Sequence, residues 1–293
     1  KYFQKEGIEF HGDASFLKAG IVFADQLVTV SPTYAQEIRT PYYGEGLEGI
    51  LETRADDLTG ILNGIDTTVF NPASDPLIPF PYDAESLPAK QKNKEALIDE
   101  LGLTIDPGTP LVGMVTRLTK QKGIDLVLRV FDEMMEAGIG FLMIGTGEKN
   151  YEHFFRGIAQ RTGNRSMGLT EFNDPLAHRL YAGSDFFLMP SQFEPCGLAQ
   201  MIALRYGTIP IVRATGGLRD TVVPYNEFTD EGNGFSFENY NAHDMLHAVR
   251  YALDIYQNRQ RMDSIRRRAM KQDWSFQKSV LEYARLYIEI VRL

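Results

Sequence analysis

The feature that most constrains the fold is an alternation, after about residue 110, of short apolar runs with longer amphipathic ones. Runs that are apolar throughout indicate strands of a parallel sheet, and the amphipathic runs indicate helices that cover both of its faces. The sequence therefore predicts a doubly wound α/β domain, whose ligands bind beyond the carboxyl ends of its strands. The expected strands are Leu111–Thr116, Phe141–Ile144, Phe186–Met189 and Ile209–Val212, and the expected helices are Gly123–Ala137, Tyr151–Gln160, Pro175–Ala182 and Gly197–Tyr206.

The two ends of the chain differ from this central pattern. The first hundred residues are less regular, and short strands are expected at Gln26–Val30 and at Ile61–Gly64, where the second ends in a turn. The five prolines in Asn71–Pro88 indicate a linker or a surface loop. At the C-terminal end we expect three helices with no strand between them, Asn241–Gln257, Arg261–Lys271 and Phe276–Arg292.

Composition argues against several classes of protein. A net charge of −9 disfavours a nucleic-acid-binding protein, which needs a concentrated basic surface. No apolar run approaches the ~20 residues of a membrane-spanning helix. The one cysteine, Cys196, excludes an internal disulfide and a cysteine-built metal site, and it suits a reducing cytoplasm. An arginine-dense stretch is interpreted as a solvated helix face; its members are Arg261, Arg266, Arg267 and Arg268.

The most informative loop follows the first expected strand. Arg117 and Lys122 lie between that strand and the mouth of the next helix, where free backbone amides and the helix dipole favour anions. Two cations at this place can flank a diphosphate and neutralise charge that builds on a leaving group. The alternative is a pair of surface cations in a βα loop, and the pattern alone does not decide between the two.

A second loop follows the strand Phe186–Met189. Glu194 lies at the mouth of the next helix, where it can accept hydrogen bonds from a sugar; the alternative is a solvent-facing loop carboxylate. Gly197 lets the backbone approach a ligand closely, and the helix start offers the amides of Gly197, Leu198 and Ala199. Cys196 is interpreted as a packing or backbone residue rather than a nucleophile, because no histidine lies close in the sequence to act as its base.

Three shorter motifs carry less information. Thr215-Gly216-Gly217 follows a strand and suggests a tight turn beside a ligand, although a plain turn fits equally well. Gly145-Thr146-Gly147 is not a dinucleotide fingerprint, because Asn150 occupies the position of its third glycine. His243 and His247 have the spacing of a zinc-binding helix, but the glutamate of that motif and a third ligand are lacking, so no metal site is expected.

Taken together, these stretches resemble the glycogen/starch synthase family. Its members are retaining transferases of the GT-B type, which move glucose from ADP-glucose to the non-reducing end of an α-1,4-glucan. The segments that carry the resemblance lie in family order and reach over nearly the whole chain. They are residues 16–38, 60–66, 116–128, 176–200, 206–222 and 234–237.

The resemblance implies a role for each candidate residue. Arg117 and Lys122 match the pair that holds the donor diphosphate, and Glu194 matches the carboxylate beside the donor glucose. Phe172 lies where the family usually has an aromatic residue near the adenine. The other donor-binding positions belong to two loops that line the same cleft; they are Cys196, Gly197, Leu198 and Ala199 in one loop and Thr215, Gly216 and Gly217 in the other.

Three positions depart from patterns seen in the family or its relatives. Ala199 replaces a threonine that some members have, which removes one hydroxyl contact to phosphate. Glu171 precedes Phe172 where glycine is common, which alters the loop that faces the base. Ile202 occupies the position of a second glutamate found in related transferase families, and this favours the synthases over those relatives.

The resemblance also divides the chain into parts. Residues 1–63 are expected to be a remnant of the N-terminal, acceptor-side domain with its Rossmann-like fold, and residues 64–275 the nucleotide-sugar-binding domain. Residues 276–293 are expected to form a helix that crosses back to the N-terminal domain. The lysine-containing Gly-Gly-rich loop and the cleft histidine of the family's N-terminal domain are not found. We therefore expect the chain to lack most of that domain and to need it, or a partner chain, for turnover.

The expected function is that of a glycogen or starch synthase with ADP-glucose or ADP and an α-1,4-glucan as its binding partners. No cofactor or metal is expected, because the two cations fill the role of a metal. Nucleic acid and membranes are not expected partners, and the cytoplasm, or a plastid in a plant, is the expected location. Two alternatives are a related GT-B transferase that uses a UDP- or GDP-sugar, and a non-catalytic module that binds nucleotide or glucan.

Overall fold

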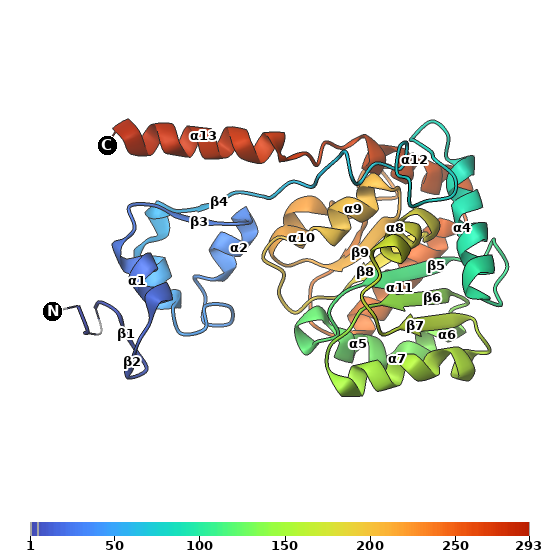
Figure 1. Cartoon of the computed structure of the whole chain (residues 1–293), viewed down its shortest axis with the longest axis horizontal. Helices are drawn as coiled ribbons and strands as arrows, with labels where there is room; N and C mark the ends of the chain where they lie inside the picture. Colours follow the sequence, from blue (N-terminus) through green and yellow to red (C-terminus); the bar gives the residue numbers. More distant parts are fainter. Residues whose placement is uncertain (1, 5, 293) are drawn as a thin grey trace.

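The computed structural model describes residues 2–4 and 6–292. Among these residues, six parallel strands form one sheet in the order β10-β9-β8-β5-β6-β7 (Figure 1). In chain order the strands run outward from β5 to one edge, and the chain then returns to add β8 on the other side of β5. The strand order therefore reverses between β5 and β8. The strands are β5 (Leu111–Val115), β6 (Gly140–Ile144), β7 (Ser166–Leu169), β8 (Phe186–Met189), β9 (Ile209–Arg213) and β10 (Phe235–Phe237).

Helices cover both faces of this sheet. One large apolar cluster joins the sheet to α5, α6, α7 and α11, and a second joins it to α4, α8 and α9. The doubly wound parallel α/β fold is thereby confirmed. The helices of this six-stranded lobe are α4 (Pro88–Leu101), α5 (Ile124–Arg129), α6 (Phe131–Glu136), α7 (Lys149–Thr162), α8 (Asp174–Gly183), α9 (Ala199–Arg205), α10 (Gly216–Thr221), α11 (Ala242–Tyr256) and α12 (Arg259–Lys271), with a 3-10 turn, η2, at Lys120–Lys122.

Several sequence predictions for this lobe need correction. The helix predicted over Gly123–Ala137 is two helices, because Val130 leaves the helical region with φ −121° and ψ 20°. The edge strands β7 and β10 were not predicted, since they are short and lack a continuous apolar run. The helix expected from Gly197 begins at Ala199.

The proline-rich segment is a packed part of the lobe rather than a linker or surface loop. Asp75, Ile78 and Tyr82 are buried, and the Tyr82 hydroxyl donates a hydrogen bond of 2.7 Å to the carbonyl of Tyr206. Pro88 is the first residue of α4, a helix that the sequence analysis did not predict. Proline suits this position because the first helical amide has no partner within the helix.

The N-terminal lobe is smaller and lies to the left in Figure 1. Its two parallel strands are β3 and β4, and its small core contains Ile21, Leu47 and Leu51. The strand predicted at Ile61–Gly64 is wrong by three residues: β4 ends at Gly60, and the chain then leaves toward the other lobe. The elements are β1 (Glu9–Phe10), β2 (Asp13–Ala14), α1 (Phe16–Phe23), β3 (Leu27–Thr29), α2 (Pro32–Glu37), α3 (Glu48–Thr53), η1 (Ala55–Asp57) and β4 (Leu58–Gly60).

Two chain segments pass between the lobes. Gly64 packs so closely on the second crossing that a Cβ there would lie 2.4 Å from the backbone nitrogen of Phe276. The Ser279 hydroxyl donates a hydrogen bond of 2.5 Å to the carbonyl of Leu62. The second crossing leads into α13 (Phe276–Arg292), which extends over the N-terminal lobe (Figure 1). No helix of the described residues is long and apolar enough to span a bilayer.

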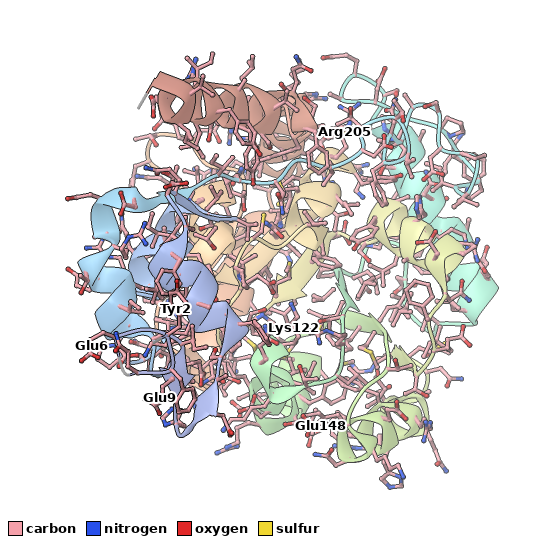
Figure 2. All side chains as sticks on the ribbon, turned by 60° about the vertical axis from the view of Figure 1, so that its left-hand side comes forward. Tyr2, Glu6, Glu9, Lys122, Glu148 and Arg205 are labelled. Carbon is pink, nitrogen blue, oxygen red and sulfur yellow. The ribbon has the colours of Figure 1, made fainter. Side chains whose placement is uncertain are left out.

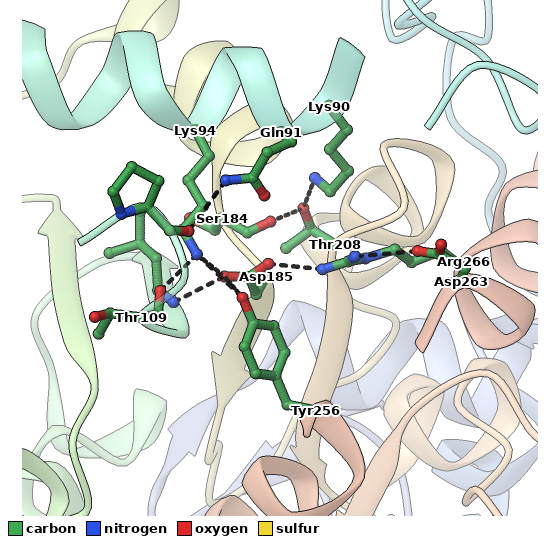
Figure 3. Close-up of polar contacts among 12 residues, drawn as sticks. Lys90, Gln91, Lys94, Thr109, Ser184, Asp185, Thr208, Tyr256, Asp263 and Arg266 are labelled. Atoms are coloured by element: carbon green, nitrogen blue, oxygen red, sulfur yellow. Dashed lines mark hydrogen bonds and ion pairs between the residues drawn. The ribbon is translucent and has the colours of Figure 1, made fainter. Parts of the chain in front are cut away.

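A buried ion cluster ties α4, β8 and α12 together at the end of the sheet opposite to the carboxyl ends of the strands (Figure 3). Asp185, directly before β8, lies 2.6 Å from Lys94 and 2.6 Å from Arg266. Burial raises the pKa of Asp185, but these two cations and the amide of Leu111 outweigh it and lower the pKa overall.

The arginine-rich stretch is therefore not a single solvated face. Arg266 belongs to the buried cluster, and Arg268 donates a hydrogen bond of 3.0 Å to the carbonyl of Gly232. Arg261 lies 3.4 Å from Glu227, and Arg267 is exposed as predicted. Most of these arginines fix α12 to its neighbours.

Candidate functional site

The loops that follow β5 and β8 cross each other where the strand order reverses. Gly123 ends the first loop with φ +72°, and a Cβ there would lie 2.1 Å from the carbonyl oxygen of Pro190 in the second loop. The amide of Gln192 donates a hydrogen bond of 2.8 Å to the carbonyl of Gln121. Open α/β sheets bind their ligands at such a reversal point, outside the carboxyl ends of the strands.

Lys122 and Glu194 meet at this crossing. The Lys122 Nζ lies 2.5 Å from the Glu194 Oε2, and the Ser191 hydroxyl donates a further hydrogen bond of 3.1 Å to the same oxygen. Glu194 is buried, and these two donors take the place of water around its carboxylate. Lys122 is labelled in Figure 2, in which the N-terminal lobe is turned forward. The structure thus joins two of the predicted catalytic residues in one ion pair.

Arg117 lies on the same loop but outside this ion pair. Its side chain is exposed, and its Nη2 lies 3.5 Å from the Gln121 Oε1. It borders an apolar pocket of about 300 Å³ beside the crossing, which Phe172 also lines. Phe172 is 91% exposed, so its ring is free to contact a ligand in that pocket.

The same pocket contains residues that the sequence analysis did not assign to the site. Gly145 has φ +153°, and a Cβ there would lie 1.8 Å from the carbonyl oxygen of Thr116, so the loop after β6 packs directly on the loop after β5. Rejecting the Gly145-Thr146-Gly147 motif as a dinucleotide fingerprint left its glycines without a role. Their position directly after a second strand of the sheet is the signal that could have assigned Gly145 and Gly147 to the site. The pocket residues outside the predicted set include Phe70, Gly145, Thr146 and His178.

His178 belongs to a buried polar network beneath the pocket. Its Nδ1 lies 2.7 Å from the Asp75 Oδ2, and the Tyr206 hydroxyl donates a 2.5 Å hydrogen bond to the same oxygen. Burial and the Asp75 carboxylate raise the pKa of Tyr206 well above its usual range. Phe70 stacks on the His178 ring at 5.0 Å. No local pattern links these residues, because the fold assembles them from distant parts of the chain.

The turn before α9 holds the predicted amides. Gly197 has φ +70°, Leu198 is 46% exposed, and Ala199 is the first residue of the helix. The buried Gln200 donates from its Nε2 to the carbonyls of Cys196 (3.0 Å) and Gly197 (2.8 Å), which fixes the turn.

Cys196 itself has the environment of a packing residue. It is buried, and burial raises the pKa of its thiol, which keeps the thiol protonated at neutral pH. This agrees with the interpretation that it is not a nucleophile.

The residues after β9 add a third loop to the candidate site: Thr215 is the N-cap of α10, and Gly216 and Gly217 are its first two residues. Thr215 is buried, and the amide of Gly217 donates a hydrogen bond of 3.0 Å to the Glu194 carbonyl. Gly216 has φ +45°, and a Cβ there would lie 2.0 Å from the same carbonyl oxygen. These glycines therefore bring the turn into direct contact with the backbone of Glu194.

The histidine pair considered as a zinc motif lies elsewhere. His243 lies 3.8 Å from Glu133 on the surface. Within residues 2–4 and 6–292, no group of three or more His, Cys, Asp or Glu side chains is arranged to hold a metal ion.

Two family models match the chain. The model described as "Glycosyl transferases group 1" matches residues 99–269, more than half of the chain. The model described as "Starch synthase catalytic domain" matches residues 1–53. The first match lies within the six-stranded lobe and the second within the N-terminal lobe.

Individual relatives give the same result. The chain is 52% identical to a glycogen synthase from Bacillus cereus (strain Q1) over 98% of its own length, and 50% identical to one from Geobacillus thermodenitrificans over 100%. It spans 60% of the length of each of these relatives. Among solved structures, the catalytic domain of starch synthase IV from Arabidopsis thaliana, bound to ADP and acarbose, matches with 36% identity and a TM-score of 0.92, covering 100% of this chain and 62% of the other.

Proposed function

The chain belongs to the group 1 glycosyl transferases, and from that premise we propose that it supplies the donor-binding part of a glycogen or starch synthase. The reaction proposed is transfer of glucose from ADP-glucose to the non-reducing end of an α-1,4-glucan, with retention of configuration. The observation that carries the proposal is the Lys122–Glu194 pair at the reversal point of the sheet. It sets a cation and a buried carboxylate where a nucleotide-sugar ligand is expected in such a fold.

The proposed donor occupies the three loops together. Arg117 and Lys122 hold the diphosphate, and Phe172 contacts the adenine over the pocket that Arg117 borders. Glu194 lies beside the glucose. The turn Cys196–Ala199 supplies backbone amides, and Thr215–Gly217 lies beside it in the same cleft. The starch synthase IV structure, which is bound to ADP and acarbose, supports a nucleotide and a glucan as ligands.

Bond cleavage proceeds through an oxocarbenium-like transition state in this proposal. Negative charge grows on the departing diphosphate, and Arg117 and Lys122 stabilise it, while the diphosphate accepts the proton of the glucan hydroxyl. Such electrostatic contacts are typically worth ~3–4 kcal/mol in the transition state. Glu194 holds Lys122 at 2.5 Å before the donor arrives, so part of the cost of ordering that side chain is met by the fold. In this proposal Arg117 and Lys122 stabilise the departing diphosphate without a resident metal.

The proposed donor and acceptor sides of the cleft belong to different parts of the chain. We propose that residues 64–275 bind the donor and that residues 1–63 and 276–293 belong to the acceptor side of the cleft, with further acceptor-side residues supplied by an N-terminal domain or a partner chain. The apolar residues that α13 leaves exposed support this, since they offer a surface for such a domain; Val280, Leu281, Tyr287 and Ile288 are more than half exposed. The buried, unpaired Cys196 suits a reducing compartment, for which we propose the cytoplasm.

Donor choice in a turnover assay tests the proposal. This chain, completed with the remaining part of a related glycogen synthase, is supplied in turn with ADP-, UDP- and GDP-[14C]glucose, and label transferred to maltoheptaose is measured. Highest turnover with ADP-glucose is expected. Highest turnover with a UDP- or GDP-sugar would identify a different transferase of the same fold, and ADP binding without any turnover would identify a non-catalytic module.

A further inference from the structure

A carboxylate of the N-terminal lobe contacts Thr215 and Gly216 of the other lobe, which belong to the proposed donor site. Glu37, the last residue of α2, is half-buried and accepts a hydrogen bond of 2.9 Å from the Thr215 hydroxyl. The amide of Gly216 donates to both of its oxygens, at 3.0 and 3.1 Å. A charged acceptor shared by three donor contacts is a strong interaction, and it fixes the orientation of the Gly216 peptide.

A second carboxylate makes the reverse contact. Asp220, on α10, accepts from the Ser31 hydroxyl at 2.5 Å, from the Thr33 hydroxyl at 2.5 Å and from the Thr33 amide at 3.2 Å. Ser31 is the N-cap of α2, and it is fully buried. A carboxylate on each helix thus accepts hydrogen bonds from the N-terminal end of the other helix. Contacts at both ends therefore join α2 to α10.

Two tyrosines extend this contact to the loop that carries Glu194. The Gln192 Nε2 donates to the Tyr42 hydroxyl at 3.2 Å, and the Arg213 Nη2 donates to the Tyr43 hydroxyl at 3.3 Å. Arg213 in turn donates to the carbonyl of Gln192 at 2.5 Å. The segment 31–43 therefore contacts both site loops that follow β8 and β9.

Other hydrogen bonds also hold the turn at Gly216, since the Gly217 amide donates to the Glu194 carbonyl and the Leu218 amide donates to the Thr215 carbonyl, both at 3.0 Å. Glu37 is the carboxylate that accepts from the amide of Gly216 itself. The backbone of Gly216 is in the left-handed region, and it packs within contact distance of the Glu194 carbonyl, so a small rotation of this peptide moves the backbone of Glu194. The Glu37 Oε2 would lie 3.6 Å from the position of a Cβ at this glycine. Gly216 therefore contacts both the Glu194 backbone and the Glu37 carboxylate.

We propose that Glu37 is a positioning residue for the donor site: with Asp220 it forms a reciprocal carboxylate clamp between α2 and α10 that holds the Gly216–Gly217 turn against Glu194. The donor loop is then set correctly only when α2 is docked. Docking of the acceptor-side lobe is thereby coupled to nucleotide affinity, through hydrogen bonds that the ligand does not touch. This inference rests on the proposed donor site.

ADP titrations of the 293-residue chain by calorimetry test the coupling. Glu37→Ala is expected to weaken ADP binding about tenfold or more, because the Gly216 amide and the Thr215 hydroxyl lose a charged acceptor. Glu37→Gln keeps an oxygen that accepts from both groups, so its affinity is expected to return to within about threefold of the wild type. Glu52→Ala is the matched control, since Glu52 is a carboxylate of the same lobe that pairs with Arg39 at 2.7 Å within the lobe.

Hydrogen exchange of the ligand-free chain gives a readout that does not depend on ADP. Amides of residues 214–218 are expected to exchange at least tenfold faster in Glu37→Ala than in the wild type, while amides of β6 and the melting of Trp274 fluorescence stay unchanged. Glu52→Ala is expected to leave residues 214–218 as in the wild type. Faster exchange throughout the chain would instead indicate a general loss of stability and contradict a positioning role.

The outcomes separate the two proposals. If Glu37→Ala changes neither exchange at residues 214–218 nor ADP affinity, while Lys122→Ala abolishes ADP binding, the clamp is wrong and the donor site stands. If the wild type does not bind ADP but Glu37→Ala still accelerates exchange at the turn, the clamp stands and the donor assignment is wrong.

Discussion

The six-stranded lobe and the N-terminal lobe differ in how completely they bury their apolar side chains. The first encloses two large clusters, in which side chains such as Leu188 and Phe141 have at most 1% of their surface exposed. The second centres on Ile21, Leu47 and Leu51, and it leaves Phe16 90% exposed. The first lobe has a core that can sustain its fold, whereas the second depends on contacts outside its own small core. The candidate donor residues lie on the first lobe, while the second supplies Glu37.

The largest expected effect is in the buried ion cluster of the six-stranded lobe. Asp185→Asn leaves Lys94 and Arg266 without their shared carboxylate, and it should lower the free energy of unfolding by about 3–5 kcal/mol. Asp132→Asn removes a carboxylate that is 75% exposed beside Arg161, and it should cost less than about 1 kcal/mol. Denaturant unfolding followed by Trp274 fluorescence measures both, and equal losses would contradict a special role for the cluster.

The same carboxylate gives this lobe a pH dependence. The pKa of Asp185 is lower in the folded state, so its contribution is fully present above the pKa of an unfolded aspartate, about 3.9, and is lost as the pH falls through the folded value. The difference in unfolding free energy between wild type and Asp185→Asn should therefore be constant near neutral pH and shrink below about pH 4. If this free-energy difference persists unchanged at pH 2, the stabilisation comes from the packing of the Asp185 side chain rather than from its charge.

Matched cavities compare the two cores directly. Leu188→Ala, in β8, should destabilise the six-stranded lobe by about 3–4 kcal/mol, because its surroundings are closely packed. Leu51→Ala, in α3, should leave the Trp274 transition almost unshifted, since Trp274 packs against the clusters of the other lobe. A Trp274 transition shifted equally by the two variants would show that the lobes unfold as one unit.

Two glycines of the six-stranded lobe separate backbone strain from contact between the site loops. Gly123 and Gly138 both have positive φ, but a Cβ at Gly138 meets nothing within 4 Å, whereas one at Gly123 meets Pro190 at 2.1 Å. Gly138→Ala should cost about 1–2 kcal/mol from strain alone and leave ADP affinity unchanged. Gly123→Ala should cost more and also weaken ADP binding, because the loop after β5 must move away from the loop that carries Glu194. Equal ADP affinity in the two variants would show that the crossing of the loops after β5 and β8 does not contribute to ADP binding.

The smallest effect on stability is expected at the surface of the N-terminal lobe. Phe16→Ser should change the free energy of unfolding by no more than about 0.5 kcal/mol, yet reduce self-association, because Phe16 lies among other exposed apolar residues such as Leu17 and Phe23. Phe228→Ser is the control, since Phe228 is equally exposed, at 91%, on the six-stranded lobe. Sedimentation velocity compares the two, and a reduction in both or in neither would contradict a lobe-specific apolar surface.

The sequence predicted the parts of this molecule whose signals are local. The central strands are continuous apolar runs, and the loop residues Lys122 and Glu194 follow directly from them. The edge strand β7 has no such run, and only its first residue, Ser166, is fully buried. The contact of Glu37 with Gly216 joins residues 179 positions apart, and no periodicity or spacing in one sequence records such a pair. The loops of the candidate site could therefore be located from the sequence, whereas their contacts with the N-terminal lobe could not.

The central claim is that the crossing of the loops after β5 and β8 binds a nucleoside diphosphate through Lys122. Calorimetric titration of the chain with ADP tests it, with Lys120→Ala as the control because Lys120 is an exposed lysine of the same 3-10 turn. One saturable site is expected, with affinity unchanged in Lys120→Ala and lowered by about a hundredfold in Lys122→Ala. Equal affinity of Lys122→Ala and wild type, or no ADP binding by a wild-type chain whose Trp274 melting is cooperative, would contradict the claim.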